Sequence, residues 1–312
     1  QSVIFFTRDM LSKLSDKQYI LINLFGSPFL AFLLAYFTKH AGGEGYRFYE
    51  NENIPAYLFM CVITSLFLGL IISSEEIIKD RKILKRESFL NLSWFSYINS
   101  KIMIMFLMSA IQTILFIVIG NSILEIKGMT ISYWIVLFTT SCLANLIGLN
   151  ISSALSSVIA VYIIIPFIII PQLLFSGVLV KFDKLHTTET YSHEFVPALG
   201  DLMPARWSFE ALATRQFRNN GYEKHFFTYK MDESENLYNG TFLHDELMKI
   251  IWNCKKFKNN ADYKESLMGY FSIVRHHLEE ISEKSGINPG SWKAYLTPEK
   301  FDSETEKETI AF

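Results

Sequence analysis

The sequence predicts an all-α membrane protein, with a helical bundle in the bilayer followed by a large, mainly helical external domain. Half of the 312 residues are hydrophobic, and 27 of them are Phe. The mean hydropathy is +0.21. The long apolar runs lie before Val180, whereas most of the charged residues lie after it. This asymmetry indicates a membrane part followed by a water-exposed part.

The amino-terminal residues 1–18 are predicted to form a cytoplasmic amphipathic lead-in. They combine a short apolar patch with mixed charge and show no small-residue cleavage site, so they do not resemble a signal peptide. The sequence does not begin with Met, and it ends in a charged stretch. We therefore expect it to be part of a longer protein.

Five segments are apolar and close to the ~20 residues that a ~30 Å hydrocarbon core requires. Soluble core helices can also be apolar all round, but five such runs before Val180 favour a membrane bundle. The first run contains a Gly-Ser-Pro kink and the fifth contains Pro166 and Pro171, which helices in lipid tolerate. The predicted transmembrane helices are 19–37, 56–72, 102–119, 131–149 and 158–180.

The loop between the second and third segments is strongly basic. It holds Lys79, Arg81, Lys82, Lys85, Arg86 and Lys101, whereas the loop between the first two segments holds one Arg and three Glu. By the positive-inside rule the basic loop and the amino terminus are cytoplasmic. Residues 181–312 then form an external domain, and an odd number of crossings suggests a sixth transmembrane helix beyond Phe312.

Residues 75–90 are predicted to form a cytoplasmic connecting helix. Apolar residues alternate with the charged ones at helical spacing, which places an apolar face on the bundle and a basic face outward. Composition leaves two interpretations open. The helix either fixes the topology as a positive anchor, or it docks a cytoplasmic partner and receives force from it.

The composition also excludes several classes of function. The net charge of −2 gives no reason to expect binding to nucleic acid. Cys61, Cys142 and Cys254 are scattered, so they predict packing residues rather than a disulfide framework or a metal site. The sequence holds no GxxxxGK[ST] phosphate loop and no catalytic constellation.

Three stretches resemble the membrane domains of G-type (white/multidrug) ABC exporters, which belong to the ABC-2 permease class. In KILKRESFLNLSWFSYINSK, an Arg-Glu pair leads through a Tyr to a Ser-Lys pair at the third crossing. QLLFSGVLVKF (172–182) resembles the family's FSG segment, and MPARWSFEALATRQF (203–217) is similar to its outer-face motif. The residues after Arg218 depart from the family, whose loop here is usually shorter. The resemblance implies an ABC-2 (type V exporter-like) helical bundle.

The resemblance implies a machine of two membrane halves and two ATP-hydrolysing domains. The second half would be another copy of this chain or a homologous one. ATP and Mg²⁺ would bind a nucleotide-binding domain that is fused to this chain or separate from it. The connecting helix would transmit the motion of that domain through Glu75, Lys79, Arg81, Lys82, Lys85, Arg86 and Glu87.

In the family, the transport route runs between the halves. Alignment through the Arg-Glu and FSG motifs places Ser65, Leu68, Ile170 and Leu173 on the substrate cavity, and Val178 and Leu179 at its outer plug. Each of these residues could equally pack within the bundle or face lipid. An apolar lining suits a hydrophobic or amphipathic cargo. Gln112, Asn145 and Asn150 are expected to join helices by hydrogen bonds before they contact cargo.

Three functions follow as hypotheses for a multi-pass protein of the cell membrane. The first is the membrane domain of an ATP-driven exporter. The second is an ABC-like assembly that transmits motion to an external partner without transporting a small molecule. The third, a channel or carrier without an ATPase, is disfavoured because no ring of charged residues lines a crossing.

Overall fold

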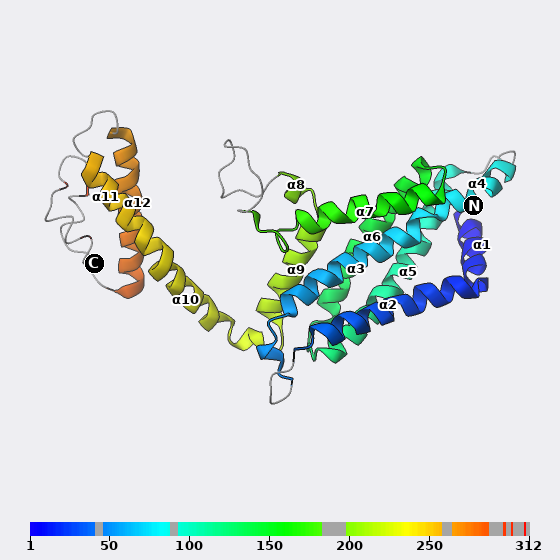
Figure 1. Ribbon diagram of the computed structural model, residues 1–312, viewed down its shortest axis with the longest axis horizontal. Helices are drawn as coiled ribbons and strands as arrows, with labels where there is room; N and C mark the ends of the chain where they lie inside the picture. The colour runs from blue at the N-terminus through cyan, green and yellow to red at the C-terminus, as the bar shows by residue number, and fades with distance from the viewer. Residues whose placement is uncertain are drawn as a thin grey trace. The chain divides into compact units, whose positions relative to one another are not determined.

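The computed structural model describes residues 1–40, 46–87, 93–182, 198–257, 264–286, 296–297, 301 and 309. Over these residues the chain is helical and contains no strand, so the predicted all-α class is confirmed. The chain divides into two compact units, Gln1–His225 and Phe226–Phe312. Figure 1 labels the helices of both units.

The first unit contains the apolar helices. Four of its helices are long and apolar enough to cross a membrane: α2, α3 with its continuation into α4, α5 and α6. α7 is also apolar but has only 17 residues. The helices are α1 (Ser2–Ser15), α2 (Lys17–Thr38), α3 (Ile54–Ser74), α4 (Glu76–Glu87), α5 (Trp94–Ile123), α6 (Thr130–Ala154), α7 (Val158–Leu174), α8 (Ala198–Asp201) and α9 (Pro204–Asn219).

Two helix limits differ most from the predicted ones. The third apolar helix begins at Trp94, where the Ser93 side chain accepts a hydrogen bond from the backbone of Ser96 as an N-cap. The fifth was predicted to reach Val180 but ends at Leu174. Gly177 follows it with φ +77°, a left-handed conformation that glycine adopts readily and that ends a helix.

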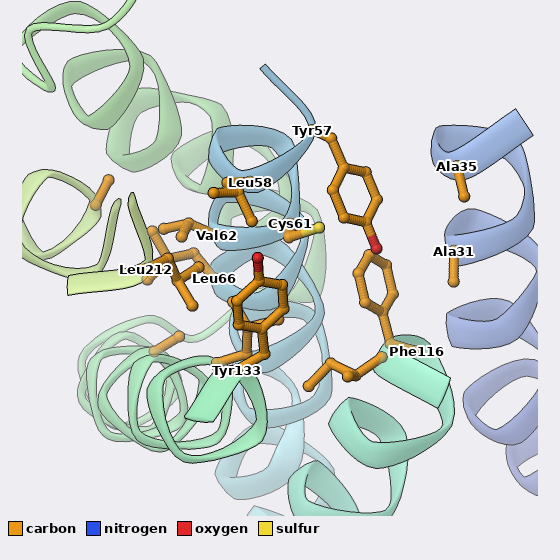
Figure 2. Packing of buried hydrophobic residues seen from close by; sticks show 14 of the residues in the cluster. Ala31, Ala35, Tyr57, Leu58, Cys61, Val62, Leu66, Phe116, Tyr133 and Leu212 are labelled. Carbon is orange, nitrogen blue, oxygen red and sulfur yellow. The ribbon is translucent and has the colours of Figure 1, made fainter. Parts of the chain in front are cut away.

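The core of the first unit lies around α3. Figure 2 shows Tyr57, Leu58, Cys61, Val62 and Leu66 of this helix with their neighbours from α2, α5, α6 and α9. The most extensive helix pair is α3 with α6. Glycines make this close approach possible, because a Cβ on Gly69 would lie 2.7 Å from the Ser141 carbonyl oxygen.

Neutral polar side chains join the helices inside the bundle. The Asn145 amide of α6 donates to the Ser109 hydroxyl of α5 over 2.8 Å, and the Gln112 amide of α5 donates to the Asn23 carbonyl oxygen of α2 over 2.8 Å. Both residues thus make the interhelical bonds expected from the sequence. Asn150 instead bonds the Leu146 carbonyl oxygen of its own helix and is exposed.

The second unit is a small helical domain. It contains α10 (Phe227–Tyr238), a π-helical segment (Asn239–Leu243), α11 (His244–Phe257) and α12 (Lys264–Ser285). α11 and α12 are amphipathic, and their buried residues form a core with Leu296 and Phe301. Burial raises the pKa of the Cys254 thiol to about 11, which fits the packing role predicted for it.

Candidate functional site

The strongest concentration of buried charge lies where α1, α4 and α5 meet. The Lys101 ammonium of α5 is 2.8 Å from Asp9 Oδ1 of α1, 3.1 Å from Glu76 Oε2 of α4 and 2.8 Å from Asp80 Oδ2 of α4. Its side chain is only 3% exposed. We call Asp9, Lys13, Glu76, Asp80 and Lys101 the corner cluster.

Helical spacing brings these five residues together. Glu76 and Asp80 are four residues apart on α4, and Asp9 and Lys13 are four residues apart on α1, so each pair shares one face of its helix. Lys13 forms a salt bridge with Glu76. Burial disfavours the charge of Lys13, but the Glu76 carboxylate together with Tyr19 and Asp9 raises the pKa of Lys13 above its ordinary value. Lys13 therefore stays charged and holds α1 against α4.

Hydrogen bonds from α6 also fix α4. The Ser152 hydroxyl oxygen accepts from the backbone N–H groups of Ile77 (3.0 Å) and Ile78 (3.2 Å), which are otherwise unpaired at the start of a helix. In return, the Arg81 guanidinium donates to the Ser153 carbonyl oxygen over 2.9 Å and to the carbonyl oxygen of Leu155. Arg81 thus caps the carboxyl end of α6.

The residues of the predicted connecting helix divide into two groups. Glu75 lies in the turn before α4, where it pairs with Lys79 and accepts a hydrogen bond from the Tyr162 hydroxyl of α7. Arg81 faces the bundle and donates to carbonyl oxygens at the end of α6. Lys82, Lys85 and Arg86 are exposed, and Glu87 is the last residue of α4. Residues 88–90 of the predicted helix lie outside the described residues.

The predicted cavity residues occupy different environments. Ser65 is buried and donates to the Leu137 carbonyl oxygen of α6 over 2.6 Å, so in this chain it packs within the bundle. The hydroxyl satisfies an α6 carbonyl group, which is the packing role that the sequence also allowed, and the assignment of Ser65 to the substrate cavity stays a prediction. Leu68 and Leu173 are half-buried, and Ile170 is exposed on the outer face of α7.

The predicted outer plug follows the end of α7. Val178 is half-buried and lines a cleft of about 340 Å³ together with Gly177, Phe182 and Arg206. Leu179 is exposed. The two residues lie in an irregular segment and not on the helix predicted to carry them.

Sequence reasoning missed most of the corner cluster. Lys101 was noted as a motif residue, but Asp9, Lys13, Glu76 and Asp80 were not assigned a role. One signal was present. Glu76 and Asp80 lie on the same side of the helical pattern as the apolar Ile77, so acidic side chains would be drawn into the bundle with it. Buried carboxylates require buried cations.

The corner cluster holds helices of the bundle together. Among the described residues there is no group of His, Cys, Asp and Glu that could hold a metal ion. The corner cluster combines two lysines with three carboxylates. Lys101 of α5 contacts α1 and α4, and Lys13 of α1 contacts Glu76 of α4 and Tyr19 of α2. A displacement of α4 would therefore be transmitted to α1 and α5.

The comparison with known families agrees with this architecture. No curated protein matched the chain. The family model described as "ABC-2 type transporter" matches residues 1–217, which hold the corner cluster and all the apolar helices that the structure describes. The match covers well over half of the chain and makes it a multi-pass membrane protein with the membrane domain of a transport permease. The chain belongs to the ABC-2 type transporter family.

Proposed function

We propose that this chain is the membrane half of an ATP-driven exporter of hydrophobic or amphipathic compounds. Its ATPase would be a nucleotide-binding domain, fused or separate, that binds ATP and Mg²⁺ and contacts the exposed basic face of α4. The amino terminus and α4 would be cytoplasmic, and a second copy or a homologous half would complete the transport route.

The corner cluster is the observation that supports this proposal most strongly. A helix that only anchors the topology needs basic residues facing the membrane surface, and α4 has these in Lys82, Lys85 and Arg86. It does not need two acidic residues buried against a lysine of the next transmembrane helix. Buried ion pairs are costly to form, so their presence favours a role in joining moving parts.

A second contact links α4 to the predicted transport route. Glu75, at the start of α4, accepts a hydrogen bond from Tyr162 of α7, the helix that carries Ile170 and Leu173. A push on α4 would thus reach α1 and α5 through the corner cluster and α7 through Glu75. We propose that these are the two routes by which ATP-driven motion enters the bundle.

The experiment uses the full-length protein with its ATPase in proteoliposomes and measures ATP turnover and export of a fluorescent amphipathic dye together. Arg86→Ala with Glu87→Ala should retain ATP turnover and lose export at least ~10-fold, because two residues at the end of the proposed contact helix are removed while the corner cluster remains. Lys39→Ala, a basic residue at the other end of α2, is the matched control and should export normally. Unchanged coupling in the double variant would return α4 to the role of a topological anchor.

The cavity is tested separately by Leu68→Arg and Leu173→Arg. A buried or half-buried Arg in an apolar route should block an apolar cargo, so we expect normal insertion and loss of export in both variants. Ile159→Arg, on the exposed face of α7 and outside the proposed lining, is the control. Export that survives both substitutions would remove these residues from the transport route.

The second candidate, an ABC-like assembly that moves an external partner, is favoured by one observation. The unit Phe226–Phe312 has its own core and exposes Tyr229, Leu237 and Phe242, each at least 60% accessible. Such exposed apolar side chains are typical of interaction surfaces. ATP turnover without movement of any amphipathic dye, lost when this unit is deleted from the full-length protein, would support this candidate over the exporter.

A further inference from the structure

A buried glutamine joins α7 to the first turn of α9. Gln172 lies in the last turn of α7, whose other residues are apolar except for Tyr162. It is 7% exposed, and its side-chain oxygen accepts a hydrogen bond from the backbone N–H of Ala205 over 3.0 Å. A buried amide group requires such a partner, so this contact fixes the two helices to each other.

The start of α9 needs the Gln172 oxygen. The first N–H groups of a helix have no partner within the helix. Met203, at the N-cap of α9, makes no side-chain capping bond, and Pro204, which follows it, has no N–H group. Ala205 is fully buried, which leaves no access for water as a replacement partner. Without Gln172, the Ala205 N–H would be buried and unpaired.

α9 itself is held by α3 and α6. The hydroxyl groups of Thr140 in α6 and Ser208 in α9 share a hydrogen bond of 2.7 Å. Phe59 of α3 meets Phe209 of α9 edge to face, with 5.8 Å between the ring centres. Leu212 of α9 is buried in the core around α3 (Figure 2). Gln172 therefore fastens the end of α7 to a helix with a fixed place on the bundle.

The residues of the outer plug follow directly after this contact. We call residues 176–182 the plug segment. The Ser176 hydroxyl donates to the Leu173 carbonyl oxygen over 2.9 Å, and its oxygen accepts from the Val178 backbone N–H over 3.3 Å. A shift of the last turn of α7 would therefore displace the backbone of Val178.

The far end of the plug segment also contacts α9. An added Cβ on Gly177 would lie 2.6 Å from a ring carbon of Phe182, so the ring packs directly on the glycine. The guanidinium carbon of Arg206 in α9 lies 5.9 Å from the centre of the same ring. Val178 and α9 line a cleft of about 340 Å³. The plug segment is thus attached to α9 near both ends, with free space beside Val178.

We propose that Gln172 is a positioning residue for the outer plug formed by Val178 and Leu179. Its hydrogen bond to Ala205 holds the last turn of α7, and with it the plug segment, against α9. Loss of this bond frees the end of α7 from α9 and lets Val178 move into the neighbouring cleft. Only the role of the plug rests on the proposed function; the contact between Gln172 and α9 does not.

The first test is amide hydrogen exchange of the full-length protein in lipid nanodiscs, without any transport measurement. Gln172→Met keeps the length of the side chain but removes the acceptor, so the N–H groups of Ala205 and Val178 should exchange at least ~10-fold faster. Gln172→Glu keeps an acceptor oxygen at the start of a helix and should exchange like the wild-type protein. Gln112→Met, which removes a buried glutamine that joins α5 to α2, is the matched control and should leave both N–H groups unchanged.

The second test is leakage of a fluorescent amphipathic dye through the same variants in proteoliposomes without ATP. Gln172→Met should leak at least ~10-fold faster than the wild-type protein, because the plug spends more time displaced. Gln172→Glu and Gln112→Met should not leak, since a general loss of stability does not move the plug. Phe182→Ala removes the other attachment of the plug segment and should speed exchange at Val178 even if Gln172→Met fails to insert.

Two results would overturn the positioning role of Gln172. One is wild-type exchange at Val178 in both Gln172→Met and Phe182→Ala. The other is equal acceleration in Gln112→Met, which would make the effect a general loosening of the bundle. Faster exchange in Gln172→Met alone, with no ATP-driven dye transport even by the wild-type protein, would support the contact with α9 and contradict only the proposed export function.

Discussion

The corner cluster and the α3–α6 interface hold the same bundle together by different means. The α3–α6 interface is made of small and neutral residues: Gly69 packs against the Ser141 backbone, and the Ser65 hydroxyl donates to the Leu137 carbonyl oxygen. The corner cluster is made of long charged side chains, and the single ammonium of Lys101 contacts three carboxylates on two helices.

This difference indicates which helices can move relative to one another. A backbone contact of the Gly69 kind fixes the distance between two helices, because no side chain can adjust to a shift. A lysine with three carboxylates within reach can keep one partner while another moves away, because its stem has four rotatable bonds. We infer that α3 and α6 move as one block, that α4 follows this block because Ser152 and Arg81 join it to α6, and that α1 and α5 adjust to it through the corner cluster.

The largest predicted effect lies in the corner cluster. Lys101→Met removes the ammonium that compensates Asp9 and Asp80 and should lower the free energy of unfolding by about 3–5 kcal/mol. The measurement is denaturant or thermal unfolding in detergent. Lys39→Met, a partly exposed lysine that pairs with Glu125, should change stability by less than ~1 kcal/mol.

A second substitution tests whether the loss comes from uncompensated charge. Asp80→Asn in the Lys101→Met background should recover part of the lost stability, because it removes one of the uncompensated carboxylates. The Asn side-chain oxygen can still accept the hydrogen bond that the Tyr97 hydroxyl donates. If the two substitutions instead add as independent losses, the cluster does not act as a unit.

The next largest effect lies in the α3–α6 interface. Gly69→Ala places a methyl group 2.7 Å from the Ser141 carbonyl oxygen and 2.8 Å from the Ala144 Cβ, so the helices must separate at a cost of about 1–3 kcal/mol. Gly26→Ala, on α2 with nothing within 4 Å of the added atom, is the matched control and should be neutral or slightly stabilising. Equal unfolding midpoints for the two variants would mean that α3 and α6 are not tightly joined.

The same comparison explains what the sequence could predict. The sequence predicted the apolar segments because a helix needs about 20 apolar residues to cross a bilayer, and α2, α3, α5 and α6 each contain such a stretch. The end of the fifth helix was misread because apolar Val178 and Leu179 continue the composition of α7, whereas the chain leaves the helix before Gly177. Composition reports the environment of a segment but not its backbone conformation.

The site was predicted less completely for a related reason. The exposed residues Lys82, Lys85 and Arg86 stand out by charge alone, so the sequence indicated the outward face of α4. The inward face depends on which helices meet there. Asp9 lies 92 positions from its partner Lys101, and no local pattern connects them. The carbonyl partner of the Ser65 hydroxyl likewise depends on the close approach of α6, which no local pattern predicts.

A smaller effect is expected from the neutral hydrogen bonds of the bundle. The Ser109 hydroxyl oxygen accepts from Asn145 (2.8 Å) and from Ser141 (2.9 Å), so Ser109→Ala should cost about 1 kcal/mol. Ser122→Ala, which removes an exposed hydroxyl bonded only within its own helix turn, should have no measurable effect on the unfolding midpoint. A Ser109→Ala loss as large as that of Lys101→Met would erase the distinction between the two regions.

The smallest effect on stability is expected at the outward face of α4. A substitution there tests whether this face binds a partner or contributes to packing. Lys82 is exposed, so Lys82→Glu should change the free energy of unfolding by less than ~0.5 kcal/mol. If this face docks the ATPase, the reversed charge should nevertheless weaken the association of the protein with its ATPase. The difference between variant and wild type should diminish as ionic strength rises, because salt screens exposed charges. The measurement is co-purification of the ATPase at low and high salt. An association that ignores both the substitution and the salt would mean that the ATPase contacts the bundle elsewhere, and the corner cluster would then lack a source of motion.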